Sequence, residues 1–408
     1  MAVASQAVRP LQLSAGNQLL YLCVTNFMEL PDKRPRLPAL TSLRFFAALH
    51  VVMFHLYTMH IIEGAGLYRR LASIGYVGVS LFFVLSGFIL VYTYAGREWT
   101  KAAFWRARFA RVYPAYLFSL VLTAPSFFYV CIKLKNMDIP FFAWFKTHVV
   151  LSATLPPLLL QAWGPNAALA WNPPAWSLSV EAFFYLAFPF LLGWLLYSRK
   201  NTLVWIALAS WLVSLALSSG YWLLQPDGVA HTDDQFLNLF WLNAVKFNPL
   251  ARLPEFVIGM ALGFLFLRKE VERKWATPLL LGGVFAFLAI ATLSPRIPYP
   301  ILHDSALAPA FAAIIFGLAL RPQWISLLEI KPLILLGDAS YTLYLLHSFI
   351  LSSYFSPFGQ LRHMTPGGIA IGLAIPIAVS LLVYRWIETP ARRWLRPKQA
   401  TAVQVMAE

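Results

Sequence analysis

The chain has 408 residues, of which 59% are hydrophobic and 12% are charged, and its mean hydropathy is +0.65. A soluble globular domain carries about 25% charged residues, so this composition excludes one and predicts an all-α polytopic membrane protein in a lipid bilayer. The formal net charge is +15, but the basic residues collect in short runs between apolar segments. That pattern is typical of loops that set membrane topology, so we expect no nucleic-acid partner.

About ten transmembrane helices are expected, because ten apolar segments reach the length of about 20 residues that a bilayer requires. They lie near 42–62, 75–95, 112–132, 178–197, 203–223, 245–267, 277–293, 305–320, 333–353 and 367–388. A further apolar piece, 141–160, ends in Pro156-Pro157 before a loop rich in Gly, Pro and Asn, and we interpret it as re-entrant or interfacial.

Basic loop residues predict the orientation. With ten spans and the N-terminus inside, most of these residues fall on the inner side, as the positive-inside rule requires. Counting 141–160 as a true span would place the later basic loops outside. Both termini are therefore predicted to be cytoplasmic, in a cytoplasmic (inner) membrane.

Three regions are expected along the chain. Residues 1–36 form an N-terminal cytoplasmic extension, 37–396 the membrane domain and 397–408 a short cytoplasmic tail. The apolar run from Leu19 to Phe27 is too short to span and follows no strong basic cluster, so it does not read as a signal peptide.

The first span carries two polar residues that share a face. Arg44 and His55 are eleven residues apart, which is three helical turns and a small remainder, or about 16 Å along the axis. In the predicted orientation Arg44 lies at the inner end and His55 past the middle of the membrane. An imidazole can take a proton from a hydroxyl and return it. The alternative, a buried histidine bonded to a backbone carbonyl, stays open.

A pair of arginines lies in the inner loop that leads into the third span. Arg108 and Arg111 are three residues apart and would share a helical face. Guanidinium groups bind phosphates through paired, charge-assisted hydrogen bonds, so a phosphorylated cytosolic cofactor is a natural partner. Arginines at a cytoplasmic helix end are also routine topology anchors, and the pair alone does not decide between these roles.

The fourth span contains an acidic residue within hydrocarbon. Ser177, Glu181 and Tyr185 recur every four residues and form one polar stripe, which follows Trp176. A charged group in a bilayer costs several kcal/mol, so one that is present there pairs or does chemistry. We expect Glu181 to meet His55 at similar depth and to raise its basicity. The alternative is a structural carboxylate that satisfies Trp or Arg donors.

Two weaker polar groups follow. Arg252 and Glu255 are three residues apart in the sixth span and predict an intramembrane ion pair, with a structural role favoured. Ser340, Tyr344 and His347 form another stripe, and His347 is a second candidate base. No close His, Cys or acidic pair has metal-ligand spacing, so no metal is expected. No Gly-rich phosphate loop or Gly-x-Ser-x-Gly elbow is present either.

Six motifs in order give the chain a family resemblance. From about Arg36 to Leu395 it resembles the acyltransferase family 3 membrane proteins, which transfer acyl groups, usually acetyl, to hydroxyls on sugars and other acceptors. The matching residues are Arg44 and His55 (Arg-x10-His), the segment Gly78 to Phe88, Arg108 and Arg111 (Arg-x-x-Arg), Ser177, Glu181 and Tyr185 (Ser-x3-Glu-x3-Tyr), the segment Gly337 to His347, and Glu388, Pro390 and Arg392 (Glu-x-Pro-x-Arg).

The resemblance implies ten spans, a cytosolic acyl-coenzyme A donor (acetyl-CoA or another acyl-CoA) and a glycan or lipid-linked sugar acceptor. It assigns Arg44, Arg108 and Arg111 to the donor. His55 would activate the acceptor hydroxyl or carry the acyl group briefly, and Glu181 would orient His55 or bind the acceptor. The residues expected around the acceptor or behind the catalytic groups are Ser177, Tyr185, Trp176, Arg252, Glu255, Tyr344 and His347.

An integral membrane O-acyltransferase is therefore the leading hypothesis. Some relatives carry an extracytoplasmic hydrolase-like domain after the membrane part, and here a stand-alone type is expected. Trp163, Trp171 and Trp176 suit sugar stacking, and a role as interface anchors explains them equally well. The alternative is a transporter or flippase of a lipid-linked or sugar-like substrate. Against it, the sequence shows no duplicated halves and predicts no paired broken helices.

Overall fold

The computed structural model describes residues 34–62, 65–133, 144–145, 147–230, 238–322, 324–355 and 365–395. Most of the predicted extension 1–36 and the predicted tail 397–408 lie outside these residues, so those domain boundaries stay predictions.

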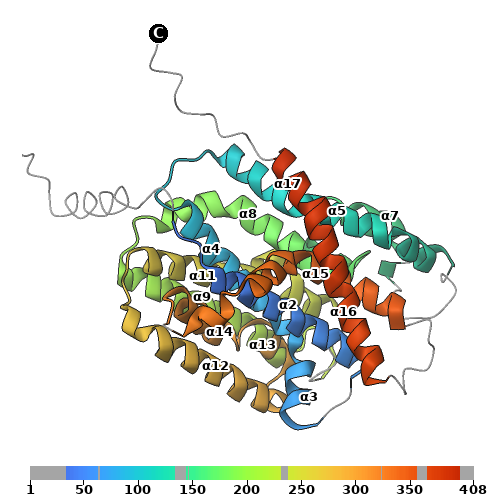
Figure 1. The fold of residues 1–408 in the computed structure, drawn as a ribbon. Coiled ribbons are helices and arrows are strands. Elements are labelled where there is room, and N and C mark those ends of the chain that lie inside the picture. The colour runs from blue at the N-terminus through green and yellow to red at the C-terminus, as the bar shows by residue number, and fades with distance from the viewer. Residues whose placement is uncertain are drawn as a thin grey trace, which may run out of the picture.

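The protein is a bundle of helices, and the described residues contain no strand (Figure 1). Ten helices or helix pairs of this part are long and apolar enough to cross a membrane, which confirms the predicted number. The elements of five or more residues that build the spans and their connections are α2 (Pro38–Thr58), α3 (Gly66–Ser73), α4 (Gly78–Tyr94), α5 (Lys101–Lys133), α7 (Val149–Thr154), α8 (Trp176–Leu195), α9 (Lys200–Leu224), α10 (Phe240–Phe247), α11 (Pro249–Leu267), α12 (Ala276–Leu293), α13 (Tyr299–Asp304), α14 (Ala308–Ala319), α15 (Lys331–Phe355), α16 (Pro366–Val383), a π-helical turn (Tyr384–Glu388) and α17 (Thr389–Leu395).

Helix α5 is longer than predicted. It begins at Lys101, so Arg108 and Arg111 lie inside a helix and not in the loop that the sequence suggested. The segment Lys101 to Arg111 has no Gly or Pro to stop a helix, whereas Pro114 and Pro125 are accommodated within it. The helical start fixes both arginine side chains on one face.

Two of the spans are broken, which the sequence analysis did not predict. Helix α10 ends before Asn248, whose side chain accepts a bond from the backbone N–H of Leu250 at 2.9 Å and caps α11. Pro249 at the first helical position cannot continue the preceding helix. The second break separates α13 from α14. The expectation stated above concerned paired breaks in two corresponding halves, whereas these two breaks lie in the sixth and eighth spans.

The second break is enclosed by protein. The backbone carbonyl of Ser305, just after α13, accepts a hydrogen bond from Trp211 Nε1 of α9 at 3.0 Å. Its hydroxyl lies 3.1 Å from that of Ser218 on the same helix. Non-helical backbone at membrane depth needs such partners because lipid supplies none. The breaks leave α10 and α13 as short segments that pack on each other and on α9.

Two helix pairs form the centre of the bundle: α4 packs on α11, and α2 packs on α15. The spans built on α4, α11 and α14 are mostly buried, whereas those built on α9, α12 and α16 are mostly exposed. The exposed side chains of these outer helices are largely apolar, as a lipid-facing surface requires.

Glycines allow these central pairs to approach closely. A Cβ added at Gly259 of α11 would lie 1.9 Å from the carbonyl oxygen of Val84 on α4, and one at Gly87 would lie 2.1 Å from that of Phe256. At the N-terminal ends of α2 and α15, a Cβ on Gly337 would lie 2.0 Å from the carbonyl oxygen of Thr41. Small residues at helix contacts are the usual solution for packing in membranes.

The segment 141–160 does not form a span in its described part. Helix α7 has six residues and is followed by a turn. Tyr116 and Tyr113 of α5 donate hydrogen bonds to the carbonyls of Pro156 and Pro157, at 2.6 and 3.0 Å. The turn therefore lies against α5, consistent with the predicted re-entrant or interfacial segment.

The substitution Gly259→Ala tests the α4–α11 contact. Because the new methyl group would overlap backbone, we expect a loss of about 1–3 kcal/mol of stability, seen as a lower melting temperature in detergent. Gly193→Ala in α8 is the matched control, since a Cβ there meets nothing within 4 Å. An equal effect of the two substitutions would contradict the close contact.

Candidate active site

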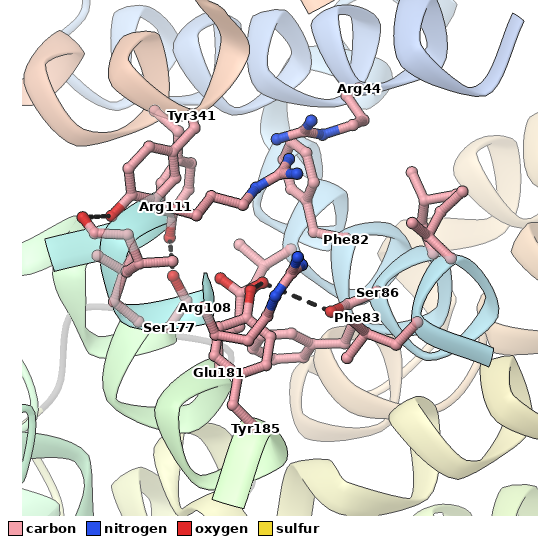
Figure 2. Close-up of a pocket in the computed structure, with 17 residues that line it drawn as sticks. Arg44, Phe82, Phe83, Ser86, Arg108, Arg111, Ser177, Glu181, Tyr185 and Tyr341 are labelled. Carbon is pink, nitrogen blue, oxygen red and sulfur yellow. Dashed lines mark hydrogen bonds between the residues drawn. The ribbon is translucent and has the colours of Figure 1, made fainter. Parts of the chain in front are cut away.

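Three arginines from two helices line one cavity. Arg44 of α2 and Arg108 and Arg111 of α5 surround a cavity of about 110 Å³, together with residues of α4, α8 and α15. We call it the arginine cavity; its remaining lining residues are Val79, Phe82, Phe83, Leu85, Ser86, Ile89, Leu90, Val112, Ser177, Leu178, Glu181, Tyr185, Tyr341 and Tyr344. The predicted stripe Ser177, Glu181 and Tyr185 thus faces a single space (Figure 2).

Two of the three guanidinium groups are free to bind a ligand. Arg44 and Arg111 lie next to each other in Figure 2, and neither donates a hydrogen bond to any described residue. Arg108 donates to the Tyr94 hydroxyl at 3.1 Å and lies over the rings of Tyr94 and Tyr185. Two like charges held side by side with unused donors make a site for an anion.

Glu181 lies among the arginines and not beside His55. Its carboxylate accepts a short hydrogen bond from the hydroxyl of Tyr185 and a long one, at 3.4 Å, from that of Ser86. Its charge acts on Arg44 and Arg111. The contact that the sequence analysis expected between Glu181 and His55 is not made, because α8 turns its polar stripe toward α4 and α5.

His55 lines a second cavity, nearer the C-terminal end of α2. This histidine cavity has a volume of about 270 Å³. The cavity is lined by Val51, Phe54, His55, Tyr76, Val79, Leu169, Pro173, Pro174, Trp176, Asn238, Asn243, Lys246, Phe247, Tyr299, His303, Tyr344 and Ser348. Its wall combines apolar and aromatic side chains with several polar groups, which is the usual composition of a small-molecule site.

The two cavities meet at Val79 and Tyr344, which line both. The Tyr344 hydroxyl donates to the carbonyl of Pro174 at 2.8 Å and accepts from the hydroxyl of Ser177 at 2.9 Å. These bonds hold the ring in place between the arginine cavity and the histidine cavity. Tyr344 is therefore part of a fixed partition.

His347 is the polar neighbour of His55. Their ring centroids are 4.8 Å apart. Nδ1 of His347 bonds the backbone carbonyl of Tyr344 at 2.7 Å, so Nδ1 carries the hydrogen and Nε2 a lone pair. That Nε2 is buried and has no partner among the described residues. Gly337 packs on Thr41 near the N-terminal ends of α15 and α2, and His347 lies beside His55 farther along both helices. The two helices therefore run parallel.

Of the three tryptophans proposed for sugar stacking, Trp176 lines the histidine cavity. Trp171 instead stacks on Phe127 with 4.9 Å between ring centroids, and its Nε1 donates to the Leu120 carbonyl. Trp163 packs edge-on against Phe183. Neither of these two rings lines the cavity.

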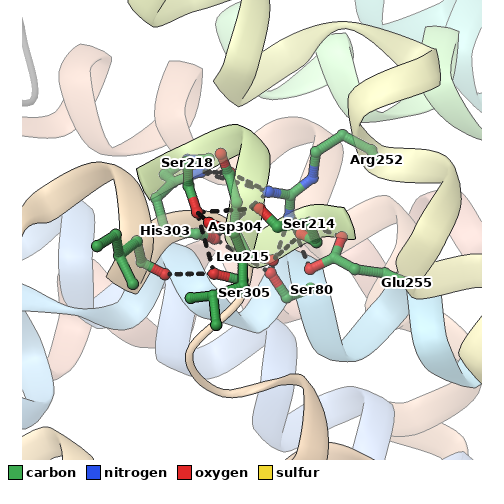
Figure 3. Close-up of polar contacts among 10 residues, drawn as sticks. Ser80, Ser214, Leu215, Ser218, Arg252, Glu255, His303, Asp304 and Ser305 are labelled. Carbon is green, nitrogen blue, oxygen red and sulfur yellow. Dashed lines mark hydrogen bonds and ion pairs between the residues drawn. The ribbon is translucent and has the colours of Figure 1, made fainter. Parts of the chain in front are cut away.

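A buried ionic network lies behind the histidine cavity (Figure 3). Arg252 pairs with Glu255 at 2.9 Å, as the sequence predicted, and also makes a short contact with Asp304. Asp304 in turn contacts Nδ1 of His303. His303 was not among the predicted site residues, and the eighth span was expected to begin at residue 305, just after Asp304. Two adjacent polar residues at the edge of an apolar segment were the available signal.

Comparison with known proteins decides the family. The family described as "Acyltransferase domain" matches residues 37–385. The chain belongs to this acyltransferase family. It is thus an integral membrane acyltransferase, since the match covers the ten spans almost entirely. The search among solved structures found no match.

Two kinds of relative are similar over nearly the whole chain. "Acyltransferase MdmB" of Streptomyces mycarofaciens is 28% identical over 91% of this chain and 96% of its own length. "O-acetyltransferase OatA" of Staphylococcus aureus is 27% identical over 88% of this chain and 57% of its own. "Peptidoglycan O-acetyltransferase OatA" of Listeria monocytogenes is 27% identical, over 88% and 56%. The chain thus spans little more than half of the OatA proteins.

Removing Arg252 tests the network. Arg252→Ala leaves two buried carboxylates without their cation, so we expect a loss of about 3–5 kcal/mol, measured as the yield and melting temperature of folded protein in detergent. Lys274→Ala removes one side of the exposed pair with Glu272 and should change stability by less than about 0.5 kcal/mol. Equal stability of the two variants would show that the network contributes little.

Proposed function

We propose that this acyltransferase moves an acyl group, acetyl in the simplest case, from acyl-coenzyme A to a hydroxyl of a glycan or lipid-linked sugar. The observation that carries the proposal is the pair of cavities that meet at Tyr344: one has unused guanidinium donors, and the other has His55. Coenzyme A has the matching form, with phosphates at one end and a thioester at the end of a long arm.

The arginine cavity fits the donor. Arg44 and Arg111 have donors available for phosphate oxygens, and Arg108 lies on the same face of α5. Arg44 and His55 are eleven residues apart on α2, about 16 Å along the axis, a distance that the pantetheine arm can bridge. In the proposed orientation this cavity opens to the cytosol and both termini are cytoplasmic.

His55 suits the role of general base. The acceptor hydroxyl oxygen attacks the thioester carbonyl carbon while His55 takes the hydroxyl proton. The C–O bond of the new ester forms, the C–S bond breaks, and the imidazolium returns the proton to the sulfur, which leaves as free coenzyme A. His347 Nε2 would accept an N–H bond from His55 and fix the tautomer that presents a lone pair to the cavity.

The histidine cavity fits a sugar acceptor. Trp176, Tyr76 and Tyr299 supply flat apolar surfaces, and Asn238 and Asn243 supply amides for hydroxyl groups. Two of the relatives are named O-acetyltransferases, and one of these names specifies peptidoglycan. These names support O-acetyl transfer to an envelope glycan.

Replacing His55 separates chemistry from donor binding. His55→Ala should lower acetyl transfer by about 10²–10⁴-fold, because the base is lost, while the Kd for acetyl-CoA changes less than about twofold. The measurement is release of free coenzyme A by purified protein with glycan acceptors. His50→Ala is the control, since His50 lies on the same helix, bonds the Leu71 carbonyl and lines neither cavity.

Full activity of the His55 variant would remove this residue from the mechanism. Failure of well-folded wild-type protein to bind or turn over any acyl-coenzyme A would overturn the proposed function. In that case a transporter, which leaves its substrate chemically unchanged, becomes the better explanation of the two broken spans.

Replacing Arg111 tests the donor site. Arg111→Gln removes a charged hydrogen-bond donor, so the Kd for acetyl-CoA should rise about 10–100-fold. Arg111→Lys keeps the positive charge but lacks the planar set of N–H donors, so its Kd for acetyl-CoA should lie between those of wild type and Arg111→Gln. Arg106→Gln on the same helix is the control, because Arg106 is exposed and lies outside the cavity. An equal rise for Arg106→Gln would mean that general charge, not a site, binds the donor.

A further inference from the structure

A second imidazole, that of His303, lines the histidine cavity. The reaction proposed above does not use it. His303 lies in α13, the short first half of a broken span, and its side chain is almost completely buried. The span breaks directly after Asp304. In this half-helix the ring of His303 reaches the cavity, whereas the side chain of Asp304 contacts Arg252.

The hydrogen-bond partner of His303 fixes its tautomer. Nδ1 contacts the carboxylate of Asp304, and Arg252 lies farther from the same nitrogen, at 3.5 Å. An ionised carboxylate only accepts hydrogen bonds, so Nδ1 carries the hydrogen and Nε2 has the lone pair. Nε2 has no hydrogen-bond partner in the described part of the chain. It is also not completely buried, because it is absent from the set of buried polar atoms that lack a partner. It is therefore the ring nitrogen available to the cavity.

The surrounding network holds this ring rigidly. Arg252 bonds Asp304, Glu255 and the hydroxyl of Ser80, the last at 2.8 Å, and thus joins α11, α13 and α4. The backbone carbonyl of His303 accepts from Ser80 at 3.3 Å and from Arg252 at 3.4 Å. The side chain of His303 is therefore held by Asp304, and its backbone carbonyl is held by Ser80 and Arg252.

Charge balance favours a neutral imidazole at this position. The cations that act on His303 are Arg252 and Lys246, and the network also holds the carboxylates of Asp304 and Glu255. Two cations and two carboxylates balance without a proton on His303. A neutral imidazole with Nε2 toward the cavity accepts a hydrogen bond, which is the complement of a hydroxyl group.

Aromatic rings frame this acceptor atom. Tyr76 stacks on His303 with ring centroids 5.2 Å apart and planes 17° apart, and Tyr299 packs edge-on at 5.7 Å. Trp176 lies at 6.4 Å. A sugar presents apolar C–H faces to such rings and hydroxyl groups at its edge.

We propose that His303, positioned by Asp304, binds a hydroxyl of the acceptor sugar through Nε2, and that this hydroxyl is different from the one acylated at His55. The inference rests on the proposed function and assigns His303 to acceptor selectivity: two imidazoles on one cavity would fix two hydroxyls, and with them the position that receives the acyl group. His303 is thus a substrate-positioning residue.

The test is acetyl transfer from acetyl-CoA to N-acetylglucosamine tetramer and to maltotetraose, with purified protein in detergent. His303→Phe keeps a ring that can stack on Tyr76 but has no acceptor atom. It should raise the KM for the sugar about tenfold, equivalent to roughly 1.4 kcal/mol, with little change in kcat or in the Kd for acetyl-CoA. His303→Gln places a carbonyl oxygen near the position of Nε2 and should recover most of the loss. His50→Phe is the matched control in α2.

A wild-type KM for His303→Phe would overturn the inference. So would an equal loss of kcat and of melting temperature in His303→Phe and His303→Gln, because that pattern means a structural role. If wild-type protein turns over acetyl-CoA but acetylates neither sugar, the sugar acceptor and this inference both fall. If it does not bind acetyl-CoA at all, the proposed function itself fails.

Discussion

The ion pairs of Arg252 are the interaction on which the centre of the bundle depends. Arg252 is 1% exposed, and it binds two carboxylates and a hydroxyl that come from three different spans. An unpaired charge in a membrane interior costs several kcal/mol, so these spans can assemble only in the arrangement that satisfies Arg252. Because α13 belongs to this arrangement, the break in its span and the position of His303 follow from the same ion pairs.

The close helix contacts then decide which side chains meet. Gly259 and Gly87 bring α11 and α4 together, and Gly337 brings α15 to α2. The parallel course of α2 and α15 places His347 beside His55 and Tyr344 between the two cavities. His347 and His55 are therefore neighbours because the backbones of α15 and α2 approach closely at glycine, which has no side chain.

Hydropathy was enough to predict the spans, because each must fill the bilayer with apolar residues. Helical spacing was enough to group Ser177 with Glu181 and Arg108 with Arg111, since each group lies within one helix. Spacing within a helix says nothing about which neighbour a stripe will face. The contact of Glu181 with His55 was therefore wrongly expected, and the contact of His347 with His55 was missed. The break at Asn248-Pro249 had a visible signal in its proline, whereas that after Asp304 depends on partners in α9 and α11.

The partition at Tyr344 has a consequence for the permeability of the membrane. In the proposed reaction, the phosphates of coenzyme A stay in the arginine cavity and the acceptor stays in the histidine cavity, and only the pantetheine arm reaches past the ring to His55. What crosses is an acyl group of a few atoms, and it crosses only while it is being exchanged between sulfur and oxygen. The enzyme would therefore deliver an acyl group to the far side of a bilayer without opening a pore. The ion gradients across that bilayer would be preserved at each turnover.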